Sequence, residues 1–299
     1  MPSDIHGILL LDKPLGVSSA GAVARVKRLF GAKKAGHTGS LDPLASGMLP
    51  ICFGEATKFG TQLLDADKTY RVTARLGERT ASGDRESEII EKRDLVQFST
   101  QQIERALAAF PREYAQVPPM HSAIKQDGRP LCAYARAGIT RERAARTIMI
   151  HDLQLLDWRL PDVSFDVRCT KGAYIRVLAE DLAAQLGTIA HLVTLRRLGV
   201  APFLTEPQWP FEALESMSPA QRLELLLPVD AALMALRRLD LPVGSLSAFR
   251  QGQTVSIPVE PPGNVRIYAA GLGFLGLGAI EPAGRVVPIR LVASTRCPA

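Results

Sequence analysis

The sequence has little cysteine, few aromatic residues and no long apolar run, and each shortage narrows what the protein can be. Its four cysteines are scattered over 299 residues without a Cys-x-x-Cys pair, so neither a disulfide framework nor a thiolate zinc site is expected. No apolar run approaches the length of a membrane span, and residues 1–6 lack the basic and apolar regions of a signal peptide. The five histidines are not spaced as metal ligands, and no convincing phosphate-binding loop is present. We therefore expect a reduced, cytoplasmic protein with no membrane segment, no metal and no cofactor.

Basic residues, in contrast, are present in excess and are clustered. The formal net charge is +6. Residues 1–40 hold six basic against two acidic residues, and so do residues 125–146. Two separated basic segments suit a polyanionic partner that the protein contacts at several places, although ordinary solvated surface explains them equally well. An aromatic content of 6% argues against a platform that stacks a long single strand.

Residues 36–50 are the most distinctive stretch of the chain. Three glycines and two prolines in fifteen residues exclude a continuous helix or strand, yet several apolar residues among them indicate a loop anchored on a core. Asp42 precedes Pro43, which favours an extended backbone at Asp42 and fixes the direction of its side chain. His37 lies five positions earlier. Such a loop can present a carboxylate and an imidazole in an active site, or Asp42 can simply cap a turn.

The hydropathy pattern predicts alternating helices and strands around this stretch. A helix is expected from Ser18 or Ser19 to Phe30 and is ended by Gly31. A capping box of Ser99 and Gln102 predicts another. Apolar periodicity predicts strands at 7–11, 68–76, 146–150 and 163–169 and a helix that Tyr174 opens and Gly187 ends. The polar and charged composition of residues 78–98 predicts a loop. Residues 240–299 are rich in Gly, Pro and Val and predict a small β-barrel or sandwich.

Four segments of the chain, taken together and in order, resemble a known family. They are Leu-Asp-Lys-Pro at 11–14, Gly-His-Thr-Gly-Ser-Leu-Asp-Pro-Leu-Ala-Ser-Gly at 36–47, Lys-Thr-Tyr-Arg at 68–71 and Lys-Gly-Ala-Tyr-Ile-Arg at 171–176. In order and spacing they are similar to the TruB family of bacterial tRNA pseudouridine synthases, which isomerise uridine 55 in the T-loop. The segment 274–278, with Gly284, Pro288 and Arg290, resembles the PUA-like RNA-binding domain that ends this family.

The resemblance implies a mixed α/β fold and a set of site residues. It implies a pseudouridine synthase catalytic domain at 1–239 with a central, mainly antiparallel sheet and a basic, mobile arm at about 118–146, and a PUA-like domain at 240–299. It also implies that the protein is a cytoplasmic monomer that binds the T-arm stem-loop of tRNA. The implied residues are Asp42, Tyr70 and Arg176 for catalysis and His37, Tyr70, Tyr174 and Leu195 for binding the uridine. The chain departs from the family pattern at His121, Cys132 and Ala173.

The residues are compatible with this chemistry. Pseudouridine formation breaks the bond between C1′ and N1 and joins C1′ to C5, without net redox change and without a cofactor. A carboxylate such as Asp42 can attack covalently or stabilise positive charge at C1′, and the residues leave attack at C1′ or at C6 open. Arg176 can keep that carboxylate ionised. Tyr70 can stack on the uracil or transfer a proton, and a uridine inside a folded loop has to be flipped out to reach Asp42.

Plainer interpretations stay open from the residues alone. Tyr70 and Tyr174 can be core tyrosines, Arg176 can form a structural ion pair, His37 can be a turn residue, and Leu195 takes a site role only through the resemblance. The alternative function is a non-catalytic RNA-binding or RNA-folding module that uses the same basic surface. An enzyme of nucleotide metabolism is a weaker possibility, because a small substrate would not need two basic segments.

Overall fold

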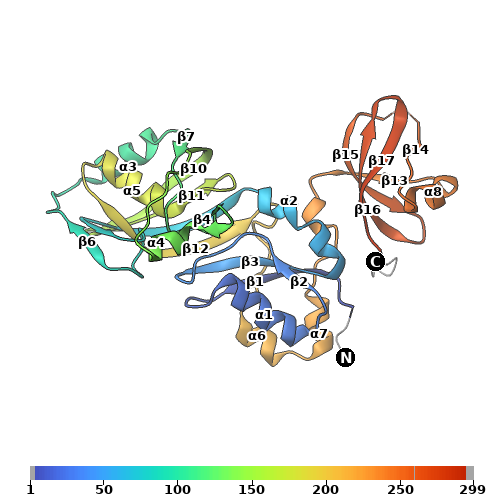
Figure 1. Ribbon diagram of the computed structural model, residues 1–299, viewed down its shortest axis with the longest axis horizontal. Coiled ribbons are helices and arrows are strands. Elements are labelled where there is room, and N and C mark those ends of the chain that lie inside the picture. Colours follow the sequence, from blue (N-terminus) through green and yellow to red (C-terminus); the bar gives the residue numbers. More distant parts are fainter. Residues whose placement is uncertain (1–3, 259, 294–299) are drawn as a thin grey trace. The chain divides into compact units, whose positions relative to one another are not determined.

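The computed structural model describes residues 4–258 and 260–293, and over this part of the chain the contacts define two compact units. Unit 1 comprises Met1–Asp42, Met48–Leu64 and Thr205–Ala299. Unit 2 comprises Pro43–Gly47 and Asp65–Leu204. Strand β3 (Ala45–Phe53) belongs to both units, because residues 45–47 lie in unit 2 and the remainder lies in unit 1. Figure 1 shows the elements in chain order.

Unit 2 is built on a sheet whose strands follow the order β3-β12-β4-β11-β10-β7. Its pairs are antiparallel except for the parallel pair of β12 and β3. Helix α3 packs against β10, and helix α5 packs against β12 and α3. The bounds of these elements are β4 (Lys68–Leu76), α3 (Thr100–Ala109), β7 (Glu113–Gln116), β10 (Arg146–Arg159), β11 (Asp162–Cys169), α5 (Ile175–Gln185) and β12 (Ala190–Val200). The prediction of a central, mainly antiparallel sheet in a mixed α/β fold is confirmed.

Strand β4 shows why the sequence gives this sheet. Its residues alternate strictly, with Tyr70, Val72 and the following even-numbered positions buried and the odd-numbered positions half-buried or exposed. This period of two is typical of a strand with one face on a core, and the predicted strand is confirmed. On the outer face, Arg71 forms a bidentate ion pair with Asp166 of β11, with N···O distances of 2.9 Å.

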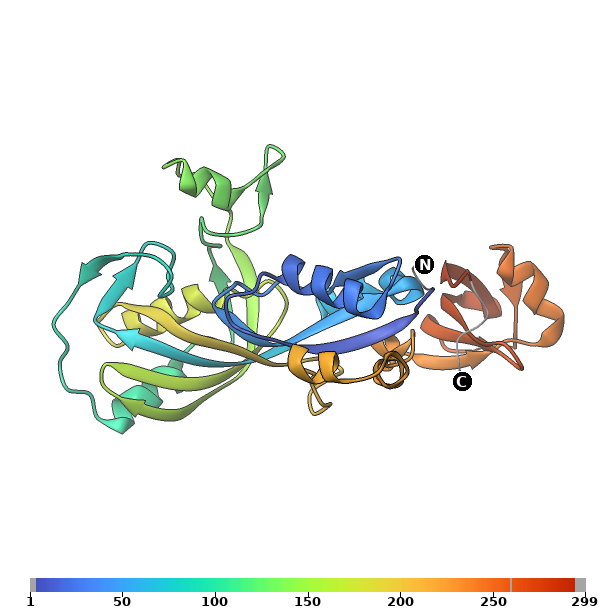
Figure 2. The ribbon, with the colours of Figure 1, turned by 90° about the horizontal axis from the view of Figure 1, so that it is seen from below.

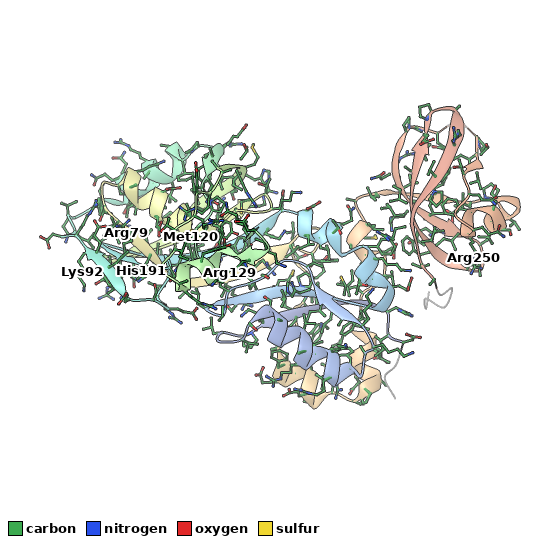
Figure 3. All side chains as sticks on the ribbon, viewed as in Figure 1. Arg79, Lys92, Met120, Arg129, His191 and Arg250 are labelled. Atoms are coloured by element: carbon green, nitrogen blue, oxygen red, sulfur yellow. The ribbon has the colours of Figure 1, made fainter. Side chains whose placement is uncertain are left out.

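Two excursions leave this sheet. The first, predicted as a loop at 78–98, contains a hairpin of β5 (Glu78–Thr80) and β6 (Ile89–Lys92), so that prediction was wrong. The charged composition of these strands is typical of a loop, but in the hairpin the charges pair with one another across the two strands. Lys92 Nζ, for example, lies 2.8 Å from Glu78 Oε1. Figure 3 labels Arg79 and Lys92 on this hairpin. The second excursion is the arm (residues 118–146), with β8 (Lys125–Gln126), β9 (Arg129–Pro130) and α4 (Leu131–Arg136). The arm stands out from the sheet of unit 2 as the green segment of Figure 2.

In unit 1, strand β1 (Gly7–Lys13) is followed by helix α1 (Ser19–Phe30) with the predicted ends. Ser18 accepts a hydrogen bond from the backbone of Gly21, and Gly31 closes the helix at φ 62°. The N-terminal strand also contacts the chain that follows unit 2. The amide of Ile8 donates to the carbonyl of Leu227, at 2.9 Å, and the segment 10–12 exchanges two hydrogen bonds with Trp209.

The stretch 36–50 is less of a loop than predicted. His37 ends strand β2 (Ala35–His37), which pairs with β3, and β3 begins at Ala45, so the loop covers only 38–44. The glycines did not prevent strand formation because Gly47 adopts φ 99° within β3 and the apolar residues around it supply buried side chains on both faces.

The C-terminal part of unit 1 is a curled sheet in the order β13-β15-β16-β17-β14, which confirms the predicted β structure (Figure 1). Its core includes Phe249, Val265, Ile267 and Val286. A short helix, α8 (Leu246–Arg250), was not predicted. Cys297, expected to be a free thiol, lies outside the described residues. The bounds are β13 (Arg237–Asp240), β14 (Val255–Ser256), β15 (Gly263–Ala269), β16 (Gly273–Glu281) and β17 (Arg285–Leu291).

Unit 1 also contains the short helices α6 (Phe211–Ser216) and α7 (Pro219–Glu224) and all of α2 (Gly60–Asp65) except its last residue. None of the helices in the described part of the chain is long and apolar enough to cross a membrane.

Candidate active site

The loop that bears Asp42 is held from within unit 1. The Ser19 hydroxyl, buried at the start of α1, accepts a hydrogen bond from the amide of Leu41 at 2.8 Å and donates to its carbonyl at 3.0 Å. The start of the loop is fixed as well, because the amide of Thr38 donates to the carbonyl of Pro50. Asp42 follows the buried Leu41 directly and is itself half-buried. A partly exposed carboxylate on an anchored loop is well placed to meet a substrate.

Tyr70 and Leu195 lie on neighbouring strands of unit 2 and share the buried face of its sheet. Leu195 pairs with Val72 of β4 and, on its other side, with Ala45 of β3. Tyr70 lies two residues from Val72 and is therefore a diagonal neighbour of Leu195. Both residues are more than nine-tenths buried. The sheet thus brings together two of the predicted substrate-binding residues.

Tyr174 and Arg176 lie together at the start of α5. Tyr174 is the N-cap residue, and a buried glutamine holds its backbone in place of a side-chain cap. Gln116 accepts a hydrogen bond from the Tyr174 amide at 2.7 Å and donates to the Tyr174 carbonyl at 3.1 Å. The same amide group contacts the hydroxyl of Tyr114. Gln116 therefore fixes the backbone from which the Tyr174 ring projects.

Arg176 connects α5 to both excursions of unit 2. Its guanidinium donates to the carbonyl of Ser82 at 2.9 Å, in the loop of the β5–β6 hairpin, and to the carbonyl of His121 at 2.8 Å, at the root of the arm. Its Nε also lies 3.7 Å from Oδ2 of Asp84, and both side chains are 6% exposed. Asp84 in turn accepts hydrogen bonds from Ser82 and from the amide of Glu86. The charged head of Arg176 is therefore oriented by several partners.

Two basic side chains extend the buried face beside Tyr70. Arg197 of β12 pairs with Tyr70 of β4, and Lys68 lies two residues before Tyr70 on the same strand. Burial, reinforced by the charge of Arg197, lowers the pKa of Lys68 to about 8. Burial also raises the pKa of Cys169, which pairs with Lys68, to about 12, so this cysteine stays a thiol.

The predicted site residues thus fall into two groups. Asp42 and His37 belong to unit 1, whereas Tyr70, Tyr174, Arg176 and Leu195 belong to unit 2. Among the described residues, no group of three or more His, Cys, Asp or Glu side chains could hold a metal ion.

Sequence reasoning missed three supporting residues of unit 2: Asp84, Gln116 and Arg197. Asp84 lies in a polar stretch that resembled a loop, and nothing local distinguishes it from its charged neighbours. Gln116 acts on Tyr174 at a separation of 58 residues, which no local pattern reveals. A signal existed for Arg197, because it follows Leu195 at the spacing that places both on one face of a strand.

Comparisons with known proteins identify the family of this chain. The model described as "TruB family pseudouridylate synthase (N terminal domain)" matches residues 27–175. The models described as "tRNA pseudouridylate synthase B C-terminal domain" and "Pseudouridine synthase II TruB, C-terminal" match residues 176–241 and 238–292. The tRNA pseudouridine synthase B of Sodalis glossinidius is 49% identical over 302 residues, which cover 98% of this chain and 97% of that protein. The protein of the same name from Burkholderia mallei is 48% identical, over 97% of this chain and 98% of that protein.

Solved structures show the same fold at lower sequence identity. A chain of the crystal structure of a Cbf5–Nop10–Gar1 complex superimposes with a TM-score of 0.73 at 23% identity, covering 97% of this chain and 85% of that chain. A chain of an H/ACA RNP bound to a substrate RNA containing 2′-deoxyuridine gives a TM-score of 0.73 at 21% identity, covering 97% and 86%. With near-complete coverage by relatives at almost half identity, this chain belongs to the TruB family of pseudouridine synthases and is an isomerase that acts on tRNA.

Proposed function

We propose that this enzyme converts uridine 55, in the T-loop of tRNA, to pseudouridine, with Asp42 as the essential carboxylate. The connection of the loop that bears Asp42 (residues 38–44, the signature loop) to the sheet carries the proposal. Asp42 lies three residues before Ala45, and Ala45 pairs with Leu195 on the strand next to Tyr70. The loop residue singled out by sequence therefore leads directly into the strand that adjoins the buried face of unit 2.

In the proposed reaction, Asp42 acts on the ribose or on the base of a flipped-out uridine. As an ionised carboxylate it attacks C1′ or C6 of the nucleotide, or stabilises the positive charge that develops at C1′ as the bond to N1 breaks. The freed uracil is then rotated and joined to C1′ through C5, and any bond between Asp42 and the nucleotide breaks. The proton on C5 is removed and N1 takes up a proton, so the product is an isomer of the substrate. Arg176 is proposed as the cation that keeps the catalytic carboxylate ionised.

Residues from unit 2 are proposed to hold the base. Tyr70 offers an aromatic ring for stacking and a hydroxyl for proton transfer, and Leu195 provides an apolar surface beside it. Tyr174, fixed through Gln116, forms a further wall. His37 is proposed to occupy the space that the flipped uridine leaves in the T-loop.

The proposed substrate is the T-arm stem-loop, bound by a cytoplasmic monomer. The basic arm supports this choice, since it stands out from the sheet (Figure 2) and its arginines and lysine can contact phosphates there. We propose that residues 1–239 form the catalytic domain and residues 240–299 a PUA-like RNA-binding domain. An isolated T-arm hairpin is then expected to be modified nearly as well as whole tRNA, and full dependence on the anticodon arm would contradict this substrate assignment.

The test of the catalytic assignment is Asp42→Asn. This change keeps the side-chain size and the Asp-Pro backbone preference but removes the charge. If Asp42 carries the chemistry, single-turnover release of tritium from C5-labelled uridine in tRNA falls by about 10⁴-fold or more, whereas the Kd for tRNA changes little because many basic residues share the phosphate contacts.

Asp166→Asn is the matched control, since Asp166 lies on the outer face of the sheet and pairs with Arg71. It is expected to retain wild-type turnover. If a folded Asp42→Asn protein also isomerises uridine at the wild-type rate, Asp42 only caps a turn, and a non-catalytic role in RNA binding becomes the better explanation for the signature loop. Mapping the product in the tRNA decides whether uridine 55 is the target.

A further inference from the structure

Arg197 occupies an unusual place for an arginine. It lies within β12, on the buried face of the unit 2 sheet, and only 1% of its surface is exposed. It pairs with Tyr70 of β4 on one side and with Gly47 of β3 on the other. The side chains of Arg197 and Tyr70 are joined by a hydrogen bond. Because a guanidinium is only a donor, the phenol oxygen of Tyr70 accepts this bond.

The burial of Arg197 is costly. Burial lowers its pKa, and the interaction with Tyr70 opposes that effect. An arginine nevertheless keeps its charge inside a protein. Lys68 is a second cation in the same region, and repulsion from Arg197 contributes to its lowered pKa. A leucine would be the ordinary occupant of such a position, as Leu195 shows two residues earlier on the same face. A cation at this position lowers the stability of the fold. A contribution of Arg197 to function would explain why an arginine nevertheless occupies it.

The backbone of Arg197 is also fixed. Strand β3 approaches so closely that a Cβ atom on Gly47 would lie 2.2 Å from the Arg197 carbonyl oxygen and 2.9 Å from its amide nitrogen. Gly47 has φ 99°, which favours glycine. The origin of the Arg197 side chain is therefore set by strands on both sides, and its guanidinium reaches the phenol from a rigid base.

We propose that Arg197 is a positioning residue that acts through Tyr70. Its hydrogen bond to the phenol oxygen fixes the rotation of the Tyr70 hydroxyl and the orientation of the ring, and its positive charge stabilises negative charge on that oxygen during the reaction. This proposal rests on the proposed role of Tyr70 in catalysis. Arg197 does not contact RNA in this proposal, because the folded sheet covers it.

A double-mutant cycle tests the proposal. Tyr70→Phe removes only the hydroxyl and is expected to slow single-turnover isomerisation by ~10²–10⁴-fold. Arg197→Met removes the cation at nearly constant length and is expected to slow it by ~10²-fold through misplacement of the phenol. In the Tyr70→Phe background, Arg197→Met is expected to cause no further loss beyond about twofold, because the oxygen through which it acts is absent.

Two further measurements separate positioning from a general structural effect. The Kd for tRNA is expected to be the same in all four proteins. Arg197→Lys, which keeps a point charge without the planar fork, is expected to retain more activity than Arg197→Met. If Arg197→Met does not fold, as judged by circular dichroism, Arg197→Lys replaces it in the cycle. Arg196→Met is the control, since Arg196 is the neighbour that pairs with Arg71 and is half-buried; its turnover at saturating enzyme is expected to be unchanged.

Each contrary outcome is distinct. Additive losses in the double variant, or wild-type turnover in Arg197→Met, would overturn the positioning role and leave that of Tyr70 intact. Wild-type turnover in Tyr70→Phe would overturn both roles. Neither result decides the proposed function itself, which depends on Asp42→Asn and on the position of the modified uridine.

Discussion

Arginines on the two faces of the unit 2 sheet have opposite environments, although the neighbouring strands β4 and β12 supply them. On the outer face, Arg71 and Arg75 form bidentate ion pairs with Asp166 and Asp162 of the adjacent strand, in contact with solvent. On the inner face, Arg197 is fully buried against Tyr70. Exposed pairs contribute little to stability because water and salt screen them. A buried cation costs free energy and has to be held by its surroundings.

This difference shows that the buried cations of the inner face are the positions where the side chain lowers the stability of the fold. The outer pairs are expected to tolerate loss of either partner, whereas the inner cations are held by close backbone contacts and by specific acceptors. Arg176 behaves like Arg197 in this respect, since it is buried and held by Ser82, His121 and Asp84. Buried charges with fixed partners are therefore the places where a small change should have a large effect.

The largest effect is expected from Gly47→Ala. The new methyl group would overlap the carbonyl of Arg197 at φ 99°, so the strand has to shift, at a cost of about 3 kcal/mol in the free energy of unfolding. Urea denaturation measures this. Gly138→Ala is the control, because Gly138 has φ 71° with open space around it, and it should cost only about 1 kcal/mol. Equal costs at both sites would show that the contact with Arg197 is unimportant.

A somewhat smaller effect is expected from Asp84→Asn. The amide keeps the shape of the side chain but removes the charge that faces Arg176, and the buried hydrogen bonds from Ser82 and Glu86 are weakened. A stability loss of about 2 kcal/mol is expected, together with a fall in single-turnover rate of at least about tenfold as Arg176 loses its orientation. Asp94→Asn, an exposed carboxylate near the same hairpin, should leave both unchanged. A full rate in Asp84→Asn would mean that the two carbonyls suffice to hold Arg176.

The third prediction concerns Lys68, whose burial on the inner face should make the free energy of unfolding depend on pH. Its pKa is lowered from 10.5 to about 8 in the folded state, so between these pH values the unfolded chain binds more protons and stability rises with pH. Below pH 8 the charged form reduces stability by the full penalty, about 3 kcal/mol from the size of the shift. Lys68→Met should therefore be more stable than wild type at pH 7, less the lost hydrogen bond to Ala66.

That advantage of Lys68→Met should shrink as the pH approaches 10.5. Thermal unfolding of both proteins between pH 7 and 10.5 measures it. A difference that does not vary with pH would show that Lys68 keeps an ordinary pKa in the folded protein.

The smallest effect is expected on the outer face. A double-mutant cycle of Arg71→Gln and Asp166→Asn should give a coupling free energy below about 1 kcal/mol, and less at high salt. Chemical denaturation at two salt concentrations provides the measurement. A coupling that equals the effects at Gly47 or Asp84 would remove the contrast between the two faces.

Sequence predicted the parts of this molecule that depend on neighbours along the chain. The ends of α1 at Ser18 and Gly31, the capping box of Ser99 and Gln102, and the alternation of β4 all follow from local rules, and all were confirmed. The β5–β6 hairpin was missed because its strands are charged on the solvent side and pair through side chains that also occur in loops.

Partners far along the chain explain the remaining omissions. The hydrogen bonds of Arg176 to Ser82 and of Gln116 to Tyr174 depend on topology, since a residue's buried neighbours across a sheet leave no local trace in composition. The roles assigned to Asp42, Tyr70, Arg176, His37, Tyr174 and Leu195 stay predictions until the variants are measured.

The pairing of β1 has a consequence for the order in which the chain is made. Unit 2 is supplied mainly by one continuous segment, Asp65–Leu204, and can fold as that segment leaves the ribosome. Unit 1 has to wait, because Ile8 finds its partner only at Leu227 and Leu10 at Trp209. Strand β1 therefore stays unpaired on that side until the chain has been synthesised beyond Trp209 and Leu227, and closing this long loop is expected to be a slow step of folding.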